Sequence, residues 1–346
     1  MLHRAAFVAS LLLAGLALSG ASPAPKHSPA PWHVVHRYSL GGAGGWDYLS
    51  YEPHGHRLFL GRGSRVLVVD TDTGKRLGEV TGLHRAHGAV FDEKDGRGFA
   101  TSGGDAKLAV FDLSTLKVLG RVPTGKDDDA SLFDPATRKV FTFDADDSTS
   151  TVVDPKAMKR IATIPLGGQP EFAVSAGDGK LYVNLVDKAE IAEIDAKAMK
   201  VVRHWSIAPC RIPTGLAIDR AHHRLFSACR NRKLVVSDDA RGRVVASVPI
   251  CAGTDGARFD PGLGDAFATC HDGHLTVVHE VTPDRYRVAQ TVTTMDGART
   301  IAIDTKGHRV FTVSARFGKL LPARPGHRYR RHAIVPGSFT LLVVAR

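Results

Sequence analysis

A repeat of about 41 residues runs through most of this 346-residue chain and constrains its fold more than any other feature. Each repeat begins with a short run of β-forming residues that ends at one marked position, polar in every copy, and successive markers lie 40 to 44 positions apart. The markers are Glu52, Asp92, Asp134, Ser175, Asp219, Asp260 and Asp304. Spacing this regular indicates one structural unit that is repeated seven times.

The repeat over Glu171–Ile207 shows what one unit contains. It holds four apolar runs, EFAVS, KLYVNLV, AEIAEID and KVVRHWSI, separated by turn formers such as Gly-Asp-Gly. The residue that ends the third run keeps the same period in its own right: Asp70, Asp112, Asp154, Asp195, Asp238 and His279. Four strands in about 40 residues is typical of a propeller blade. The sequence therefore predicts an all-β seven-bladed β-propeller with four-stranded antiparallel blades.

The two ends of the chain each carry an unpaired strand. Trp32–Leu40 forms one isolated run before the first repeat, and Ser338–Arg346 reads as the third strand of a last blade that has no fourth. We expect the N-terminal strand to complete blade seven, because joining the termini in one sheet keeps a propeller ring from opening.

The N-terminal segment has the pattern of an export signal. A short basic start is followed by the apolar run Ala5–Leu18 and by small residues before a cleavage point, so residues 1–21 are predicted to be a cleaved signal peptide. The apolar run is too short for a membrane span, which needs about 20 residues. Residues 22–31 form a Pro- and Ala-rich linker, and residues 32–346 form the propeller. The prediction is a periplasmic or secreted monomer without a transmembrane segment.

Two segments carry a family resemblance. KLYVNLVDKAEIAEIDAKAMK, over 180–200, and RLFSACRNRKLVVSDDARGRVVASVPI, over 224–250, resemble the YVTN-type (YncE-like) β-propeller repeats of exported bacterial proteins. The resemblance extends to every blade and implies the same fold. It implies little about activity, because that family consists mostly of repeat proteins without an assigned reaction, and one fold hosts many functions.

The four cysteines follow the repeat. Cys210 and Cys229 are 19 residues apart, as are Cys251 and Cys270, and the two pairs are one blade apart. In both blades the two positions fall at the same end of neighbouring antiparallel strands. This favours the disulfides Cys210–Cys229 and Cys251–Cys270, with other pairings and free thiols as the alternatives. A zinc site is disfavoured because no short Cys-x-x-Cys spacing occurs.

Positive charge is concentrated near the C-terminus. The formal net charge is +11. Arg4 of the predicted signal peptide accounts for one positive charge, and nine basic residues with no acidic residue follow Asp304. Residues 22–304 therefore carry only +1. Much of the excess lies in an insertion at about residues 316–337 of blade seven, which the prolines predict to be a long loop. One interpretation is a solvated loop, and the other is contact with a polyanion such as nucleic acid or an anionic surface. The residues expected to make that contact are Arg316, Lys319, Arg324, Arg328, Arg330 and Arg331.

Ionisable residues recur at the start of the first strand of six blades. We expect these starts to surround the mouth of the central channel, where propellers commonly bind ligands. The predicted ligand-binding residues on this rim are Asp47, His87, Asp129, Glu171, Asp255 and Arg299. The plain alternative is that a wet channel simply needs polar side chains to satisfy its loop amides.

The rim supports two further functional hypotheses besides that alternative. The first is a non-enzymatic scaffold that binds a small ligand or a protein partner at the channel mouth. The second is a metal- or cofactor-dependent hydrolase or oxidoreductase, gluconolactonase-like or quinoprotein-like, that uses the same funnel. Its divalent cation would bind near Asp47, Asp129 and Glu171, although Arg299 opposes a centred ion. The sequence contains no nucleophile elbow, phosphate loop or dinucleotide fingerprint, so no catalytic residue is assigned and the scaffold is preferred.

The acidic residues Asp127 and Asp128 beside the rim are expected to be solvated loop charges.

Overall fold

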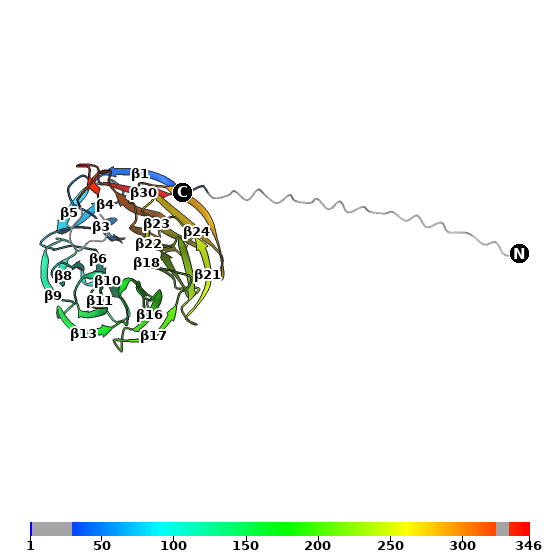
Figure 1. The fold of residues 1–346 in the computed structure, drawn as a ribbon, viewed down its shortest axis with the longest axis horizontal. Helices are drawn as coiled ribbons and strands as arrows, with labels where there is room; N and C mark the ends of the chain where they lie inside the picture. Colours follow the sequence, from blue (N-terminus) through cyan, green and yellow to red (C-terminus); the bar gives the residue numbers. More distant parts are fainter. Residues whose placement is uncertain (2–29, 323–331) are drawn as a thin grey trace. The chain divides into compact units, whose positions relative to one another are not determined.

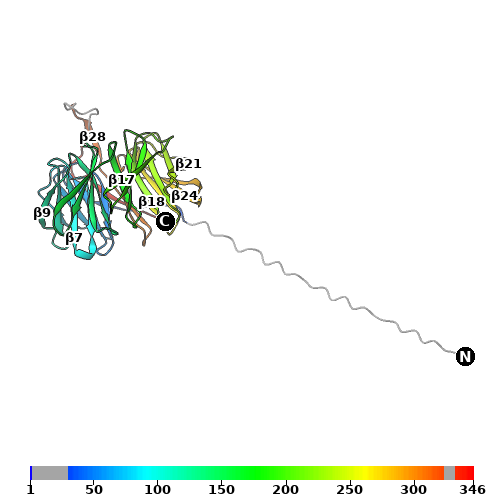
Figure 2. The same ribbon diagram turned by 90° about the horizontal axis from the view of Figure 1, so that it is seen from below.

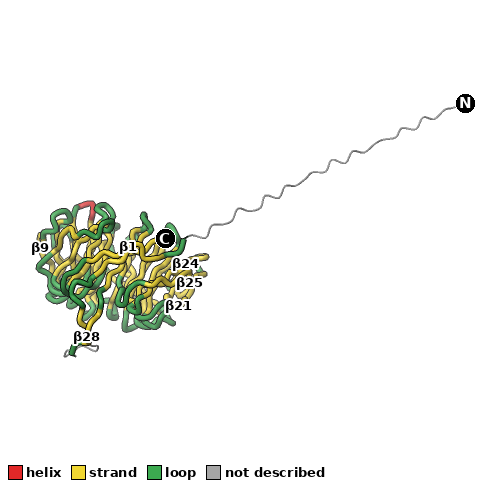
Figure 3. Tube along the Cα trace, turned by 90° about the horizontal axis from the view of Figure 1, so that it is seen from above, coloured by secondary structure: helices red, strands yellow, loops and turns green. Residues whose placement is uncertain are grey.

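Seven four-stranded antiparallel sheets follow one another around a central axis in the computed structural model of the chain, which describes residues 1, 30–322 and 332–346 (Figure 1). The predicted seven-bladed propeller is confirmed. A short 3₁₀ turn, Glu93–Asp95, interrupts blade two and is drawn in red in Figure 3. Among the described residues, no helix is long and apolar enough to span a membrane.

The blades are built from consecutive strands, numbered from the channel outward. The strands of blades one to three are β2 (Leu49–Glu52), β3 (Arg57–Arg62), β4 (Arg65–Asp70), β5 (Arg76–Val80), β6 (Ala89–Asp92), β7 (Arg97–Ser102), β8 (Lys107–Asp112), β9 (Val118–Pro123), β10 (Asp128–Asp134), β11 (Lys139–Asp144), β12 (Thr149–Asp154) and β13 (Lys159–Pro165).

The strands of blades four to six are β14 (Pro170–Ser175), β15 (Lys180–Leu185), β16 (Glu190–Asp195), β17 (Lys200–Ser206), β18 (Pro213–Asp219), β19 (Arg224–Cys229), β20 (Lys233–Asp238), β21 (Arg243–Pro249), β22 (Thr254–Asp260), β23 (Asp265–Cys270), β24 (His274–Thr282) and β25 (Arg285–Thr293).

Blade seven combines both ends of the chain. It contains β26 (Ile301–Asp304), β27 (Arg309–Ser314), β30 (Thr340–Ala345) and, as its outer strand, β1 (His33–Ser39). The pairing of β1 with β30 confirms the predicted closure of the ring, and Figure 1 shows the two strands side by side. Trp32 extends the closure to blade six, because its backbone N–H donates to Gln290 Oε1 at 2.8 Å and its indole packs edge-on against Phe267.

The core lies between neighbouring blades. The second and third strands of a blade are buried on both faces, as in β4, where Val66 to Val69 are all buried. The outer strands alternate buried and exposed residues because only one of their faces meets a neighbour. Each blade therefore depends on the blades on both sides of it for burial of its apolar surface.

Turn chemistry explains the regular spacing of the aspartates that end the third strands. Asp112 Oδ1 accepts hydrogen bonds from the backbone N–H groups of Ser114 and Thr115, at 3.1 and 2.7 Å. Asp154 and Asp195 make the equivalent bonds in the next two blades. The carboxylate fixes the turn between the third and fourth strands, so the repeat retains it.

Both predicted disulfides are present. Cys210 bonds to Cys229 and Cys251 to Cys270, with Cα atoms 5.5 and 5.8 Å apart. Each ties the loop before the innermost strand of its blade to the end of the second strand. Closing a loop of this length contributes roughly 3 kcal/mol in the chain-entropy model.

The insertion in blade seven differs from the predicted loop. Its two ends pair as a β-hairpin, β28 (Phe317–Leu320) with β29 (His332–Ile334), and β28 projects beyond the blades (Figure 2). The apolar side of this hairpin gives it a place to pack, since the Phe317 ring lies 6.1 Å from that of Trp46. The composition of the insertion did not predict the hairpin, because prolines and charged residues surround its short strands.

We expect loss of the closing strand to destabilise every blade rather than blade seven alone. Versions of the chain that start at position 32 and at Gly41 should be compared by urea unfolding, each in two forms that keep only Trp46 of blade one or only Trp205 of blade four, with the other tryptophans replaced by Phe. The version that starts at Gly41 should unfold at lower urea by both probes together, because an open ring exposes the faces of two blades. An unchanged midpoint at Trp205 would contradict this expectation.

Candidate functional site

The six predicted rim residues all line one cavity of about 1270 Å³ at the mouth of the channel. Each lies in or just before the innermost strand of its blade, and neighbouring innermost strands contact one another around the axis. Equivalent positions of the repeat therefore form a ring. The residues are Asp47, His87, Asp129, Glu171, Asp255 and Arg299.

His87 is the centre of a carboxylate cluster. Its Nδ1 lies 2.8 Å from Asp47 Oδ2 and 2.7 Å from Asp129 Oδ1, and its Nε2 lies 3.3 Å from Asp127 Oδ1. Burial alone would lower the pKa of His87, but its bonds to the three carboxylates outweigh burial and raise it to about 12. The imidazole is therefore a cation that neutralises part of the acidic rim.

A glycine lets His87 reach this position. Gly61 on β3 packs against the backbone of His87, and a Cβ at Gly61 would overlap the His87 carbonyl oxygen. Any larger residue at 61 would push the start of blade two away from blade one.

Arg299 balances the opposite side of the rim. Its Nε donates to Asp255 Oδ2 at 2.7 Å, its Nη2 donates to the Trp46 carbonyl at 3.1 Å, and Nη2 lies 3.9 Å from Asp47 Oδ1. Asp255 also lies 3.5 Å from Arg230, which blade five supplies. The guanidinium of Arg299 is thus already paired within the protein.

Glu171 is the exception among the rim carboxylates. Within the described parts of the chain, its side chain has no hydrogen bond and no cation within ion-pair distance, although it faces the cavity. Burial raises the pKa of Glu171 well above its usual value, and the nearby charges of Asp129 and Asp255 raise it further, whereas Arg230 opposes them. Among the described residues of the rim, Glu171 is therefore the carboxyl group that holds a proton easily and has no partner.

Tyr48 forms the floor of the cavity. Its hydroxyl donates to Asp129 Oδ2 at 3.2 Å, and its ring lies 5.2 Å from that of Phe172. Burial, and then the surrounding carboxylates, raise the pKa of the Tyr48 phenol well above its usual value. Tyr48 stays neutral and donates its hydrogen bond throughout the physiological range.

The expectation that Asp127 and Asp128 are solvated was wrong. The Asp127 side chain is only 14% exposed and contacts His87 and Arg85, while Asp128 is fully buried and faces Asp144 across β10 and β11. The reason is a β-bulge between Asp128 and Ala130, which turns consecutive aspartates toward different surroundings. Neither Asp128 oxygen has a hydrogen-bond partner of normal geometry among the described residues.

Sequence reasoning missed several cavity residues. Trp46, Tyr48, Arg85 and Arg230 all line the cavity. Each neighbours a predicted site residue or a cysteine, which is a weak signal at best, because the repeat position alone does not tell which neighbours turn inward.

Three of the rim residues also meet the geometry of a cation site. One ligand atom each from Asp47, His87 and Asp129 lies within 4.8 Å of the other two. This convergent set includes His87 where the sequence hypothesis had Glu171. The set fits a divalent ion only if His87 gives up its Nδ1 proton, in which case Asp127 would hold the Nε2 proton, as second-shell carboxylates do at many metal sites.

The expected polyanion contact is described only in part. Arg316 and Lys319 lie on the projecting hairpin and are exposed. Arg324, Arg328, Arg330 and Arg331 fall outside the described residues, as do residues 2–21 of the predicted signal peptide and residues 22–29 of the linker.

Comparison with known proteins identifies the fold and nothing finer. No family model matches the chain. No curated protein matches it. Among solved structures, a chain of hydrazine synthase from Kuenenia stuttgartiensis is 15% identical with a TM-score of 0.69, and the match covers 78% of this chain and 92% of that one. A chain of a mitotic checkpoint complex is 12% identical with a TM-score of 0.70, covering 87% and 96%. Identities this low carry the propeller fold alone.

We expect Asp128 to make stability depend on pH. Burial, and then the charge of Asp144, raise the pKa of Asp128 to about 8, so the folded protein keeps a proton that the unfolded chain loses near pH 4. Stability should therefore fall as pH rises from about 4 to 8. Asp128→Asn should remove the part of this slope that Asp128 contributes and stabilise the protein at pH 8 by about 1–3 kcal/mol.

Urea unfolding at pH 5, 7 and 8 measures this effect. Asp146→Asn, in the exposed turn of the same blade, is the matched control and should leave the slope unchanged. An Asp128→Asn variant that loses the same stability at every pH would show that Asp128 is ionised in the folded protein.

Proposed function

We propose that this protein is a binding protein whose channel mouth takes a small organic ligand with a cationic or strongly hydrogen-bond-donating group. The observation that carries this proposal is the unpartnered carboxyl group of Glu171 in a cavity of about 1270 Å³. Glu171 is half-buried, so water solvates its carboxyl group only in part, and a ligand in the cavity can supply the missing partner.

The charges around Glu171 favour a cation over an anion. The cationic groups nearest the centre of the rim, His87 and Arg299, are already engaged by carboxylates. An incoming anion would have to break one of these pairs and would lie beside several carboxylates. A cation could instead pair with Glu171 directly and would also be attracted by the negative charges of Asp129 and Asp255.

The same ion pairs favour binding over catalysis. Carboxylates on both ring nitrogens hold His87 in its protonated form, so it is not available as a general base. Arg299 is fixed by Asp255 and by a backbone carbonyl. These contacts hold the shape of the cavity and leave one group for the ligand.

The cellular setting belongs to the same proposal. The predicted signal peptide, the resemblance to YVTN-type repeats and two disulfides all support an exported protein, since disulfides form and persist in oxidising compartments. We place its binding function in the periplasm or outside the cell.

Cation binding should be linked to a proton on Glu171. Because the pKa of Glu171 is raised, binding a cation favours its ionised form, so affinity should rise with pH and binding should release a proton. Titration calorimetry with agmatine, putrescine and choline, in buffers of different ionisation enthalpy, measures that proton. Glu171→Gln should weaken binding about tenfold or more and abolish the release.

A matched control lies in the same blade. Glu190→Gln changes a glutamate on β16 that does not line the cavity and whose Oε2 lies 3.6 Å from His204 Nδ1, so it should leave binding unchanged. If none of the three amines binds, or if Glu171→Gln binds them as the unaltered protein does, the proposal is wrong.

A second candidate is a divalent-cation site formed by Asp47, His87 and Asp129. The convergence of their ligand atoms within 4.8 Å supports it, and nitrogen-plus-carboxylate ligation suits zinc or manganese. Asp127, 3.3 Å from His87 Nε2, would orient the ring. A bound ion would supply Lewis-acid chemistry at the channel mouth, which is the basis for the hydrolase alternative.

Zinc and manganese titration tests this candidate separately. His87→Gln should abolish uptake measured by calorimetry and elemental analysis, and Asp127→Asn should weaken it about 10- to 100-fold. Glu171→Gln should leave uptake largely intact, because Glu171 is outside the convergent set. Equal uptake by the His87→Gln variant would rule the site out.

A further inference from the structure

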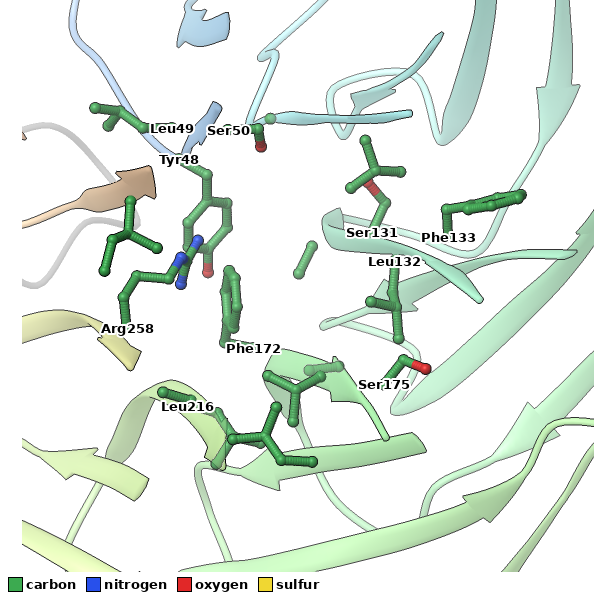
Figure 4. Close-up of a pocket in the computed structure, with 18 of the residues that line it drawn as sticks. Tyr48, Leu49, Ser50, Ser131, Leu132, Phe133, Phe172, Ser175, Leu216 and Arg258 are labelled. Carbon is green, nitrogen blue, oxygen red and sulfur yellow. The ribbon is translucent and has the colours of Figure 1, made fainter. Parts of the chain in front are cut away.

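A second, smaller cavity of about 360 Å³ continues down the channel beneath Tyr48. Tyr48 lines both cavities, and the remaining residues of the lower one follow the innermost strands away from the rim. Its wall is mainly apolar, with Leu132, Phe133, Phe172 and Leu216 among the lining residues labelled in Figure 4. The lower cavity therefore differs in chemistry from the acidic cavity above it.

Arg258 places a cation in this apolar wall. Its guanidinium carbon lies 4.7 Å above the centroid of the Phe172 ring, and its Nη1 donates to the Ala257 carbonyl at 2.7 Å. Figure 4 shows the side chain pointing toward Tyr48 and Phe172. No carboxylate of the described chain lies within ion-pair distance, which contrasts with Arg299 one blade away, whose Nε is 2.7 Å from Asp255.

The guanidinium keeps unused donors. Nε and Nη2 of Arg258 donate no hydrogen bond to any described residue, and Arg258 lines the lower cavity. The other arginine of this cavity is occupied, because Arg220 donates from Nε and Nη2 to the Ser175 carbonyl at 3.1 and 2.8 Å. Of the two arginines that line this cavity in the described structure, Arg258 is thus the one with a free pair of parallel N–H groups.

We propose that Arg258 is the anchor of a second ligand site, which takes a small amphiphilic carboxylate. The two free N–H groups match a carboxylate as a fork, and the apolar wall takes the hydrocarbon part of the molecule. A cavity of this volume holds a short chain or a single aromatic ring. We expect a monoanion, because the single positive charge of Arg258 balances one negative charge and the carboxylates of the rim above would repel a second.

The environment of Arg258 supports the geometric argument. Burial lowers the pKa of Arg258 to about 10, which still leaves it charged at neutral pH. A charged group held in an apolar wall without a counter-ion is unfavourable for folding. A ligand carboxylate would supply the missing charge.

This site is independent of the one proposed at the rim. Tyr48 separates the two cavities, and the groups that attract a ligand have opposite charge, Glu171 above and Arg258 below. Loss of one site does not entail loss of the other.

Calorimetry with sodium octanoate at pH 7 tests the proposal on the full propeller. Octanoate should bind with a stoichiometry of one, and Arg258→Met, which removes the charge but keeps a long side chain, should weaken binding about 10- to 100-fold. Arg258→Lys should fall in between because it keeps the charge without the fork. Octyltrimethylammonium, which has the same chain and the opposite charge, should not compete with octanoate for the lower cavity, whatever it binds at the acidic rim.

Two further variants guard against misfolding and against the wrong site. Ser131→Phe fills the apolar wall without touching Arg258 and should also weaken octanoate binding. Glu171→Gln should leave octanoate binding unchanged. Thermal unfolding of ligand-free Arg258→Met should show equal or higher stability, because a counter-ion-free charge has been removed.

Three results would overturn the proposal. These are absence of octanoate binding at millimolar concentration, equal affinity in Arg258→Met, or weakened binding in Glu171→Gln with no effect of Ser131→Phe. A loss of stability in Arg258→Met together with unchanged octanoate affinity would assign Arg258 a structural role instead.

Discussion

The pairing of β1 with β30 is the interaction on which the rest of this structure depends. Every blade buries apolar side chains against the blades on both sides, so a ring with one open joint exposes two such faces at once. The closing strand is held over its whole length, from His33 opposite Ala345 to Ser39 opposite Thr340. Only a closed ring brings the innermost strand of blade one beside that of blade seven, and the channel mouth exists because of that juxtaposition.

Burial then determines the chemistry of the mouth. Ring closure brings several carboxylates into a partly desolvated space, where like charges raise each other's pKa. The protein offsets most of this repulsion internally, with His87 among three aspartates and Arg299 between Asp255 and Asp47. Glu171 is left outside both arrangements. The rim is therefore a nearly compensated surface with one uncompensated group, which is a more specific feature than an acidic patch.

The sequence predicted what the repeat controls. The period predicted the number of blades, the closure of the ring and the two disulfides. It also predicted that six residues lie on one rim, because residues at equivalent positions of a propeller repeat lie at the same height and the same distance from the channel axis. It could not predict Asp127 and Asp128, since the bulge before Ala130 breaks the alternation on which such reasoning rests. It could not single out Arg258 either, because the absence of a counter-ion is a property of space around a residue rather than of its neighbours in the chain.

The two cavities make the channel electrically asymmetric along its axis. Acidic groups surround the outer cavity, and Arg258, which has no carboxylate partner in the described part of the chain, lies in the apolar inner one. A ligand suited to one cavity is therefore repelled or poorly solvated in the other. Tyr48 is the boundary, and it is tied to both sides: its hydroxyl bonds to Asp129 above, and its ring packs on Phe172, which also lies under the guanidinium of Arg258. A ligand that displaces the Tyr48 ring must disturb both contacts at once. These contacts hold the Tyr48 ring in place as the wall between the cavities, so each cavity can be occupied without the other.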